Sequence, residues 1–222
     1  SLDATTLVQR LDTPARAAEG RMSAAFGADL ADEIQCRALV PQVVRTMGRI
    51  DAVVNNASLF ELDTVADFSF ANLERHWRVN TGAPLLLAQA AHAAGGRVVV
   101  NVLDQKLWNP NPDHLSYTLS KAALEVATRM MAMAMAPRTR VCGVAPGITL
   151  TSTEMSPAEF EAAHRMTPLG RGSSPDDVAR AVQFLVESPA VTGTTLLVDG
   201  GQHLSSQPRD VVFLARSALQ PR

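Results

Sequence analysis

The stretch Arg97-Val-Val-Val-Asn-Val-Leu-Asp104 is nearly continuously apolar and ends in a carboxylate. A strand of this kind is typical of a parallel sheet with helices on both faces, because such a strand is buried on each side. Short β-branched runs alternate with longer helical patterns on either side of it, which indicates repeated βα units. The sequence therefore predicts an α/β fold built on a parallel sheet.

Further elements follow from the same two patterns. The predicted strands are Ser23–Leu30, Ala52–Ala57, Arg97–Asp104, Arg140–Pro146 and Thr194–Gly200. The predicted helices are Ala4–Gly20, Ala31–Met47, Phe70–Ala94, Leu115–Ala136 and Pro175–Glu187. The last helix has the clearest start, with Ser174 as N-cap, proline at the first position and acidic residues in the first turn.

Length and composition fit a single domain. The 222 residues are 46% hydrophobic, which is enough for a full core, so we predict one domain over residues 1–222. Residues 205–222 are predicted to be a C-terminal tail, and its apolar run Val211-Val-Phe-Leu214 can dock on a neighbouring surface.

Charge and cysteine content exclude several classes of protein. The net charge is −2 and no basic block occurs, so we expect no nucleic acid partner. No apolar run reaches the length of a membrane span and the N-terminus lacks a signal pattern, so we expect a cytoplasmic protein without membrane contact. Cys36 and Cys142 form no disulfide framework, and the five histidines are scattered, so we predict no metal.

Tyr117, the only tyrosine, precedes Lys121, one of only two lysines, by four positions. On a helix this spacing places both side chains on one face, where an ammonium can stabilise a phenolate. Shifting a phenol from its usual pKa of roughly 10 by about 3 units takes roughly 4 kcal/mol. The two side chains either act together in acid/base catalysis or are close by chance on a helix surface.

Polar and small residues follow three predicted strands, at the edge of the sheet where ligands bind in such folds. Asn55-Asn-Ala-Ser58 ends one strand, Asp104 ends the next, and Pro146-Gly147 with Thr149 follows the third. Each of these is a common strand end when taken alone. Together and in this order they are specific.

In these residues the sequence resembles the short-chain dehydrogenase/reductase family. The matching motifs are Asn55-Asn-Ala-Ser58, Val79-Asn80, Tyr117-Thr-Leu-Ser-Lys121, Pro146-Gly147 and Val198-Asp-Gly-Gly201, and the resemblance covers about residues 23–204. It implies a Rossmann-type doubly wound parallel sheet, a nicotinamide cofactor, a small-molecule substrate and a homotetramer.

The resemblance also implies roles for single residues. Tyr117 is the expected proton donor or acceptor, Lys121 would hold the nicotinamide ribose and favour the tyrosinate, and Asn80 would anchor a water. Asp29 would meet the adenine. The residues expected at the cofactor are Ser1, Asp29, Asn55, Asn56, Ala57, Ser58, Tyr117, Lys121, Pro146, Gly147 and Thr149.

Asp104 departs from the family pattern, which usually has a serine at this position, 13 residues before the tyrosine. An ionised carboxylate cannot donate a hydrogen bond to a carbonyl oxygen, so Asp104 favours a nitrogenous substrate. Pteridine reductases of the family carry this Asp-Tyr-Lys arrangement and a stacking phenylalanine, which resembles Phe60. Expected substrate contacts are Ser58, Phe60, Asp104, Trp108 and Tyr117. As alternatives, Phe60 and Trp108 pack in loops, and Asp104 caps a strand end.

A glycine-rich turn after a first strand normally holds the cofactor pyrophosphate, and the sequence contains no such turn. The first βαβ unit of the fold is therefore expected to be absent from this sequence. Either an N-terminal segment of the natural protein precedes Ser1, or the chain is a paralogue that no longer binds dinucleotide.

The leading hypothesis is an oxidoreductase that transfers hydride from NADPH to a pterin-like or related planar heterocycle through Asp104, Tyr117 and Lys121. NADPH is expected from the resemblance to pteridine reductases, with NADH left open. The alternatives are a carbonyl reductase or alcohol dehydrogenase acting on an unidentified ketone, and a non-catalytic binding or scaffold paralogue.

Overall fold

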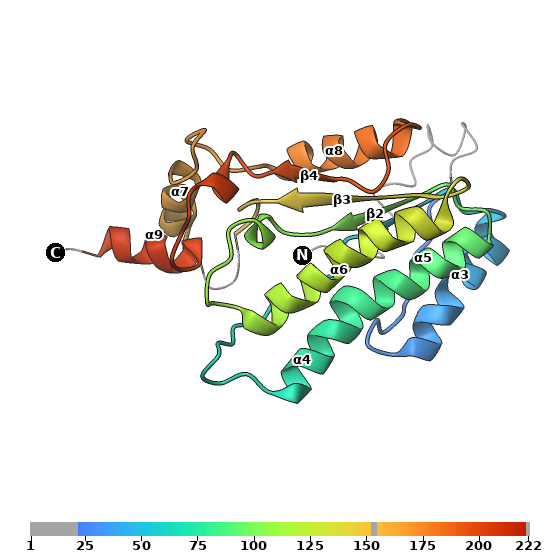
Figure 1. Cartoon of the computed structure of the whole chain (residues 1–222), viewed down its shortest axis with the longest axis horizontal. Helices are drawn as coiled ribbons and strands as arrows, with labels where there is room; N and C mark the ends of the chain where they lie inside the picture. Colours follow the sequence, from blue (N-terminus) through green and yellow to red (C-terminus); the bar gives the residue numbers. More distant parts are fainter. Residues whose placement is uncertain (1–21, 152–154, 221–222) are drawn as a thin grey trace.

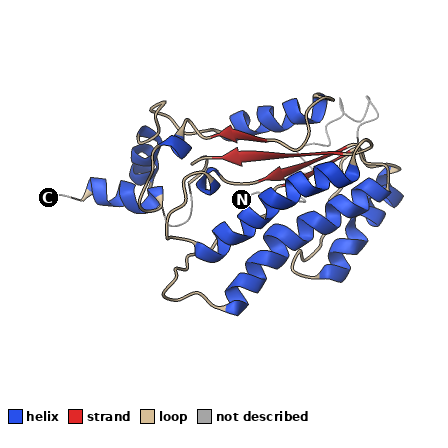
Figure 2. Cartoon of the chain, in the orientation of Figure 1, coloured by secondary structure: helices blue, strands red, loops and turns tan. Residues whose placement is uncertain are grey.

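A four-stranded parallel sheet forms the centre of the computed structural model, which describes residues 22–151 and 155–220 (Figures 1 and 2). Its strands are β1 (Ala52–Asn55), β2 (Val98–Val102), β3 (Arg140–Pro146) and β4 (Thr195–Val198), in that order across the sheet. All three pairings are parallel, which confirms the predicted fold class. The predicted helix Ala4–Gly20 and Ser1 lie outside the described residues.

Helices cover both faces of this sheet (Figure 1). Helices α5 (Ala83–Ala93) and α6 (Leu115–Met135) lie on one face, with α3 (Glu33–Met47) against α5, and α8 (Pro175–Glu187) lies on the other. Beyond the carboxyl ends of the strands, α7 (Pro157–Arg165) packs against α9 (Val211–Leu219). The arrangement matches the βα alternation of the sequence.

Two apolar layers hold β2 and β3 in the interior. Val99 and Val141 pack on the side of α5 and α6, whereas Val98, Val100 and Cys142 pack on the side of α8. Val99 and Val100 have no exposed surface, and burying one such side chain stabilises a fold by about 1.5–3 kcal/mol. The continuous apolar pattern of the opening stretch was therefore the correct indication of a strand with both faces covered.

The predicted strand Ser23–Leu30 is wrong, because residues 22–30 contain no strand. A strand is stable only when its backbone groups pair with a neighbour, and within the described residues β1 is the terminal strand of the sheet. The segment instead ends in a turn, in which the Asp29 carboxylate accepts a hydrogen bond from Ala31 N at 2.9 Å. This turn leads directly into α3.

The predicted helix Phe70–Ala94 is divided by a π-helical turn, Arg78–Gly82, into α4 (Phe70–Trp77) and α5. Pro84 has no N–H to donate to the carbonyl of Asn80, four residues earlier, so the ordinary α-helical pattern cannot continue there. Turns of this type occur frequently at functional sites. Asn80 lies in the middle of this one.

Helix α8 confirms its prediction, and the apolar run near the C-terminus lies in a further helix. Helix α8 begins and ends at the predicted residues, and Ser174 and Asp177 form a reciprocal capping box at its start. The apolar run 211–214 forms the first turn of α9, where Val211 and Ala215 are buried against Met155 and Ala163. Helices α7 and α9 were not among the predicted elements.

Candidate active site

A cavity of about 810 Å³ opens at the carboxyl ends of the strands. Its lining comes from the ends of β1, β2 and β3, from α6 and α8, and from the start of α9. The residues expected at the site that line this cavity are Asn56, Ser58, Phe60, Asp104, Tyr117, Lys121, Pro146, Gly147 and Thr149. The fold thus brings together side chains from positions that are far apart in the sequence.

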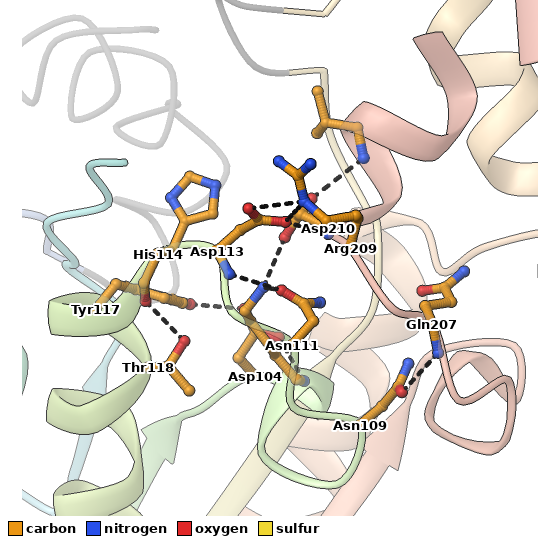
Figure 3. Close-up of polar contacts among 12 residues, drawn as sticks. Asp104, Asn109, Asn111, Asp113, His114, Tyr117, Thr118, Gln207, Arg209 and Asp210 are labelled. Atoms are coloured by element: carbon orange, nitrogen blue, oxygen red, sulfur yellow. Dashed lines mark hydrogen bonds and ion pairs between the residues drawn. The ribbon is translucent and has the colours of Figure 1, made fainter. Parts of the chain in front are cut away.

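Tyr117 and Asp104 form the centre of the site. The Tyr117 hydroxyl donates a hydrogen bond to Asp104 Oδ2 at 2.6 Å (Figure 3), and the tyrosine is only 5% exposed. The other carboxylate oxygen, Oδ1, accepts from Lys106 N at 2.8 Å. Asp104 is therefore an N-cap of the short 3₁₀ helix Gln105–Leu107 and, at the same time, the direct partner of the tyrosine.

Burial and charge shift the protonation equilibria of this centre. Burial, and then the adjacent Asp104 charge, raise the pKa of Tyr117 well above its usual value, while burial raises the pKa of Asp104. Both groups are therefore biased toward their protonated forms. A tyrosine in this state can give a proton to a substrate but does not serve as a resting phenolate.

Lys121 differs from expectation in its effect on the tyrosine. Its ammonium donates to the carbonyl of Val102 at 2.7 Å and lies 5.9 Å from the centre of the Tyr117 ring. Burial lowers the pKa of Lys121 to about 8. Lys121 counters part of the effect of burial on the pKa of Asp104, but it does not lower the pKa of Tyr117, so the expected stabilisation of a tyrosinate is not seen.

Asn80 joins the turn after β1 to α6. Its Oδ1 accepts from Leu59 N at 2.7 Å and from Ser58 Oγ at 3.2 Å, and its Nδ2 donates to Leu59 O at 2.8 Å and Ser120 Oγ at 3.0 Å. The side chain is thus fully used. A role in anchoring a water, which stays a prediction, would have to come from the backbone carbonyl of Asn80, to which Pro84 cannot donate.

The asparagines after β1 have different surroundings. Asn55 is buried and donates to Asn101 Oδ1 on β2 at 2.8 Å, and Asn101 donates onward to Thr128 on α6 at 2.9 Å. Asn55 therefore ties the sheet to α6, whereas Asn56 lines the cavity. Asp29 and Ala57 are not among the lining residues, and their cofactor contacts stay predictions.

Phe60 presents an aromatic surface to the cavity. Its ring stacks on His114 with centroids 4.1 Å apart and meets Tyr117 edge-on at 4.7 Å. The residue is still 47% exposed, so the ring has surface left for a planar ligand. Trp108 lies at the end of the same 3₁₀ helix as Lys106 but is absent from the lining. Its contact with substrate stays a prediction.

The turn after β3 approaches β4 closely. A Cβ on Gly147 would lie 2.8 Å from both Cα and Cβ of Asp199, so only glycine fits there without a shift of the chain. Thr149 follows, with its hydroxyl bonded to Gly147 O at 2.8 Å and near Ser173 Oγ at 2.6 Å. Pro146, Gly147 and Thr149 line the same cavity as Lys121, and their expected contacts with a cofactor stay predictions.

Several lining residues were not singled out at the level of sequence, and three of them form a polar group. Gln105, Lys106 and Asp210 all line the cavity, and Lys106 forms an ion pair with Asp210 at 3.0 Å. One signal was present, because Lys106 is the only lysine besides Lys121. Asp210 lies 104 positions further along the chain and gave no such signal.

Within residues 22–151 and 155–220, no group of three or more histidine, cysteine, aspartate or glutamate side chains is arranged to hold a metal ion. None of the helices described is both long and apolar enough to cross a membrane.

Comparison with known proteins agrees with this geometry. A family model described as enoyl-(acyl carrier protein) reductase matches residues 4–203. The structure of FolM alternative dihydrofolate reductase 1 from Brucella canis, complexed with NADP, is 38% identical, with a TM-score of 0.80 over 90% of this chain and 79% of that one.

Two further similar proteins are a dehydrogenase and a carbonyl reductase by name. A short chain dehydrogenase from Burkholderia cenocepacia in complex with NADP is 31% identical, with a TM-score of 0.79 over 90% of this chain and 82% of that one. Carbonyl reductase family member 4 of Danio rerio is 32% identical over 86% of this chain and 81% of that protein. The chain belongs to the short-chain dehydrogenase/reductase family and is an oxidoreductase.

Proposed function

We propose that this protein is an NADPH-dependent reductase of a pterin-like or related planar heterocycle. One observation carries the proposal: Tyr117 donates its only proton to Asp104 at 2.6 Å inside a cavity that also presents the Phe60 ring. The family's usual serine would instead donate to a carbonyl oxygen. The similarity to the alternative dihydrofolate reductase from Brucella canis supports the same substrate class, because dihydrofolate contains a pterin ring.

NADPH, when bound, supplies the hydride. The chain's own contribution is the proton, which Tyr117 gives to the ring nitrogen of the C=N bond that is reduced. Asp104, whose pKa is raised by burial, can hold a second proton and restore it to the tyrosine oxygen through their hydrogen bond. Phe60 orients the ring by stacking, and Lys121 and the Gly147 turn position the cofactor.

The choice of NADPH is supported by the similar Brucella and Burkholderia structures, which are both complexes with NADP. Pro146, Gly147 and Thr149 line the same cavity as Lys121, where we place the nicotinamide ribose that NADPH and NADH share. We also propose a cytoplasmic homotetramer, as the family resemblance implies, to be tested by light scattering coupled to size exclusion.

The test is a panel assay of NADPH oxidation with a dihydropterin, a dihydrofolate and a simple aromatic ketone. We expect turnover with the dihydropterin, and we expect Asp104→Asn to lower kcat with a smaller effect on KM, because the amide keeps the shape but cannot relay a proton. If the ketone is the better substrate and Asp104→Asn leaves its reduction intact, the proposal fails.

A carbonyl reductase is the second candidate. The raised pKa of Asp104 favours it, because a protonated carboxyl can donate to a carbonyl oxygen as serine does. Ketone reduction by this route should decline as pH rises and Asp104 ionises. Asp104→Ser should then preserve ketone reduction, whereas it should abolish reduction of a heterocycle that requires a proton relay.

A further inference from the structure

The part of the cavity wall formed by Gln105 and Lys106 contains a hydrogen-bond donor that the chain leaves unmatched. The Lys106 side chain is 3% exposed and lines the cavity. Its ammonium donates to Asn111 Oδ1 and, at 3.0 Å, to Asp210 Oδ2. An ammonium has three donors, so one remains without a partner among the described residues.

An acceptor next to Lys106 is unmatched as well. Gln105 is 7% exposed and lines the same cavity, and its Oε1 has no hydrogen-bond partner among the described residues. A buried polar atom without a partner is costly, and a ligand that supplies the partner recovers that cost. Donor and acceptor therefore lie on adjacent residues, directly after Asp104.

In the proposed reduction the centre of the site is used for proton transfer, so the donor for a second polar edge of the substrate has to come from elsewhere. Tyr117 gives its proton to Asp104, and both oxygens of Asp104 already accept hydrogen bonds. Lys106 is thus placed to do what the family's usual serine does, which is to donate to a substrate oxygen. We propose that Lys106 and Gln105 bind the lactam edge of the substrate, with Lys106 donating to the carbonyl oxygen and Gln105 accepting from the adjacent ring N–H.

The charges around Lys106 determine which kind of substrate oxygen can bind there. Lys106 is neutralised by Asp210, and Asp104 lies two residues away in sequence, so an anionic group at this wall would face two carboxylates. A neutral carbonyl meets no such repulsion. The inference rests on the proposed reduction of a planar heterocycle and adds which edge of that heterocycle binds at Gln105 and Lys106.

Polar contacts of Asn109, Asp113 and Asp210 hold the loop after β2 in place (Figure 3). Asp113 binds the Arg209 side chain at 2.8 Å and accepts from Asp210 N at 2.7 Å, and Asn109 accepts from Gln207 N at 3.0 Å. These contacts fasten the loop after β2 to the segment before α9. Arg209 takes part in these loop contacts but does not line the cavity, so a substitution of Arg209 is a matched control for loss of the loop structure.

The test compares two ligands that differ at one edge. Pterin carries a carbonyl and a ring N–H there, whereas 2,4-diaminopteridine carries an amino group and a bare ring nitrogen, so donor and acceptor are exchanged. Dissociation constants of both are measured on the NADP⁺-loaded protein at one pH. Lys106→Met should reduce the preference for pterin over the diamino compound by about tenfold, the loss expected for one hydrogen bond to a charged donor.

Lys106→Arg should retain most of that preference, and Gln105→Leu should reduce it. An unchanged ratio in Lys106→Met would overturn the inference, as would an equal loss in the control Arg209→Met, because the effect would then come from the loop and not from the donor. If the parent reduces a dihydropterin but Lys106→Met keeps the ratio, only this inference fails. If the parent neither reduces nor binds pteridines, the proposed function fails and the inference with it.

Discussion

After burial, the Asp104 carboxylate is the main cause of the raised pKa of Tyr117, and Asp104→Asn tests its contribution directly. The substitution removes a charge from a buried hydrogen bond of 2.6 Å but keeps an oxygen that can accept from the hydroxyl. Hydrogen bonds to charged groups contribute about 1.5–3 kcal/mol, and one pKa unit corresponds to about 1.4 kcal/mol. The pKa of Tyr117 should therefore fall by about 1–2 units.

The assay is a pH titration of tyrosinate absorbance in the near ultraviolet. Tyr117 is the only tyrosine of the sequence, so the signal needs no assignment. In the parent the phenol should stay protonated until the fold is lost, because burial and Asp104 both raise its pKa. In the variant, tyrosinate should form while far-ultraviolet circular dichroism still reports a folded chain.

Asp113→Asn is the control for this titration. Asp113 is also buried and lies in the same loop, but it is paired with Arg209 and does not face Tyr117. The substitution Asp113→Asn should leave the titration of Tyr117 unchanged. The reasoning is refuted if the parent phenol ionises near its ordinary pKa, or if Asp104→Asn leaves the midpoint where it was.

Three further perturbations follow from the same contacts. Tyr117→Phe should keep NADPH affinity, measured by fluorescence titration, but lose most turnover, and comparable rates in the two proteins would remove the tyrosine from the mechanism. Phe60→Ala should raise KM for a dihydropterin with little change in kcat, since a lost stacking face is worth about 0.5–1.5 kcal/mol; an unchanged KM would leave Phe60 as a loop-packing residue. The pKa of Lys121 is about 8 in the folded protein, against 10.5 for an ordinary lysine, so the unfolded chain binds more protons between these two pH values. The stability of the parent should therefore rise with pH in this range by up to about 3 kcal/mol relative to Lys121→Met. If the free energies of unfolding of the two proteins, measured by urea denaturation, change with pH in the same way across that range, the buried lysine is contradicted.

Local patterns were enough to predict the sheet and most of its helices. The strand around Val99 was recognisable because burial on both faces requires a continuous apolar run, and α8 was recognisable because Ser174 and Asp177 cap it through neighbouring backbone groups. Ser23–Leu30 failed for the opposite reason. Whether a segment becomes a strand depends on a distant neighbour, and no local pattern contains that information.

The same distinction applies to the site. Tyr117 and Lys121 were found because their relation is four residues on one helix, and Asp104 was found because it ends a strand. Lys106 and Asp210 were missed because their ion pair joins the loop after β2 to the start of α9. The π-helical turn at Asn80 had a sequence cause in Pro84, but a proline alone does not say whether a helix ends, kinks or widens.

The replacement of serine by aspartate at position 104 has a consequence for the whole cavity. A buried carboxylate beside a tyrosine is unfavourable unless a cation balances it, and here Lys121 and Lys106 both line the same cavity as Asp104 and Asp210. When Asp104 is ionised the four charges cancel, yet each lysine donates to a different oxygen, Lys121 to Val102 and Lys106 to Asp210. Because no net charge remains to attract an ion, selection must come from hydrogen-bond direction and ring stacking. A neutral heterocycle with both a donor and an acceptor on one edge satisfies these conditions, whereas a simple ketone uses only the donor.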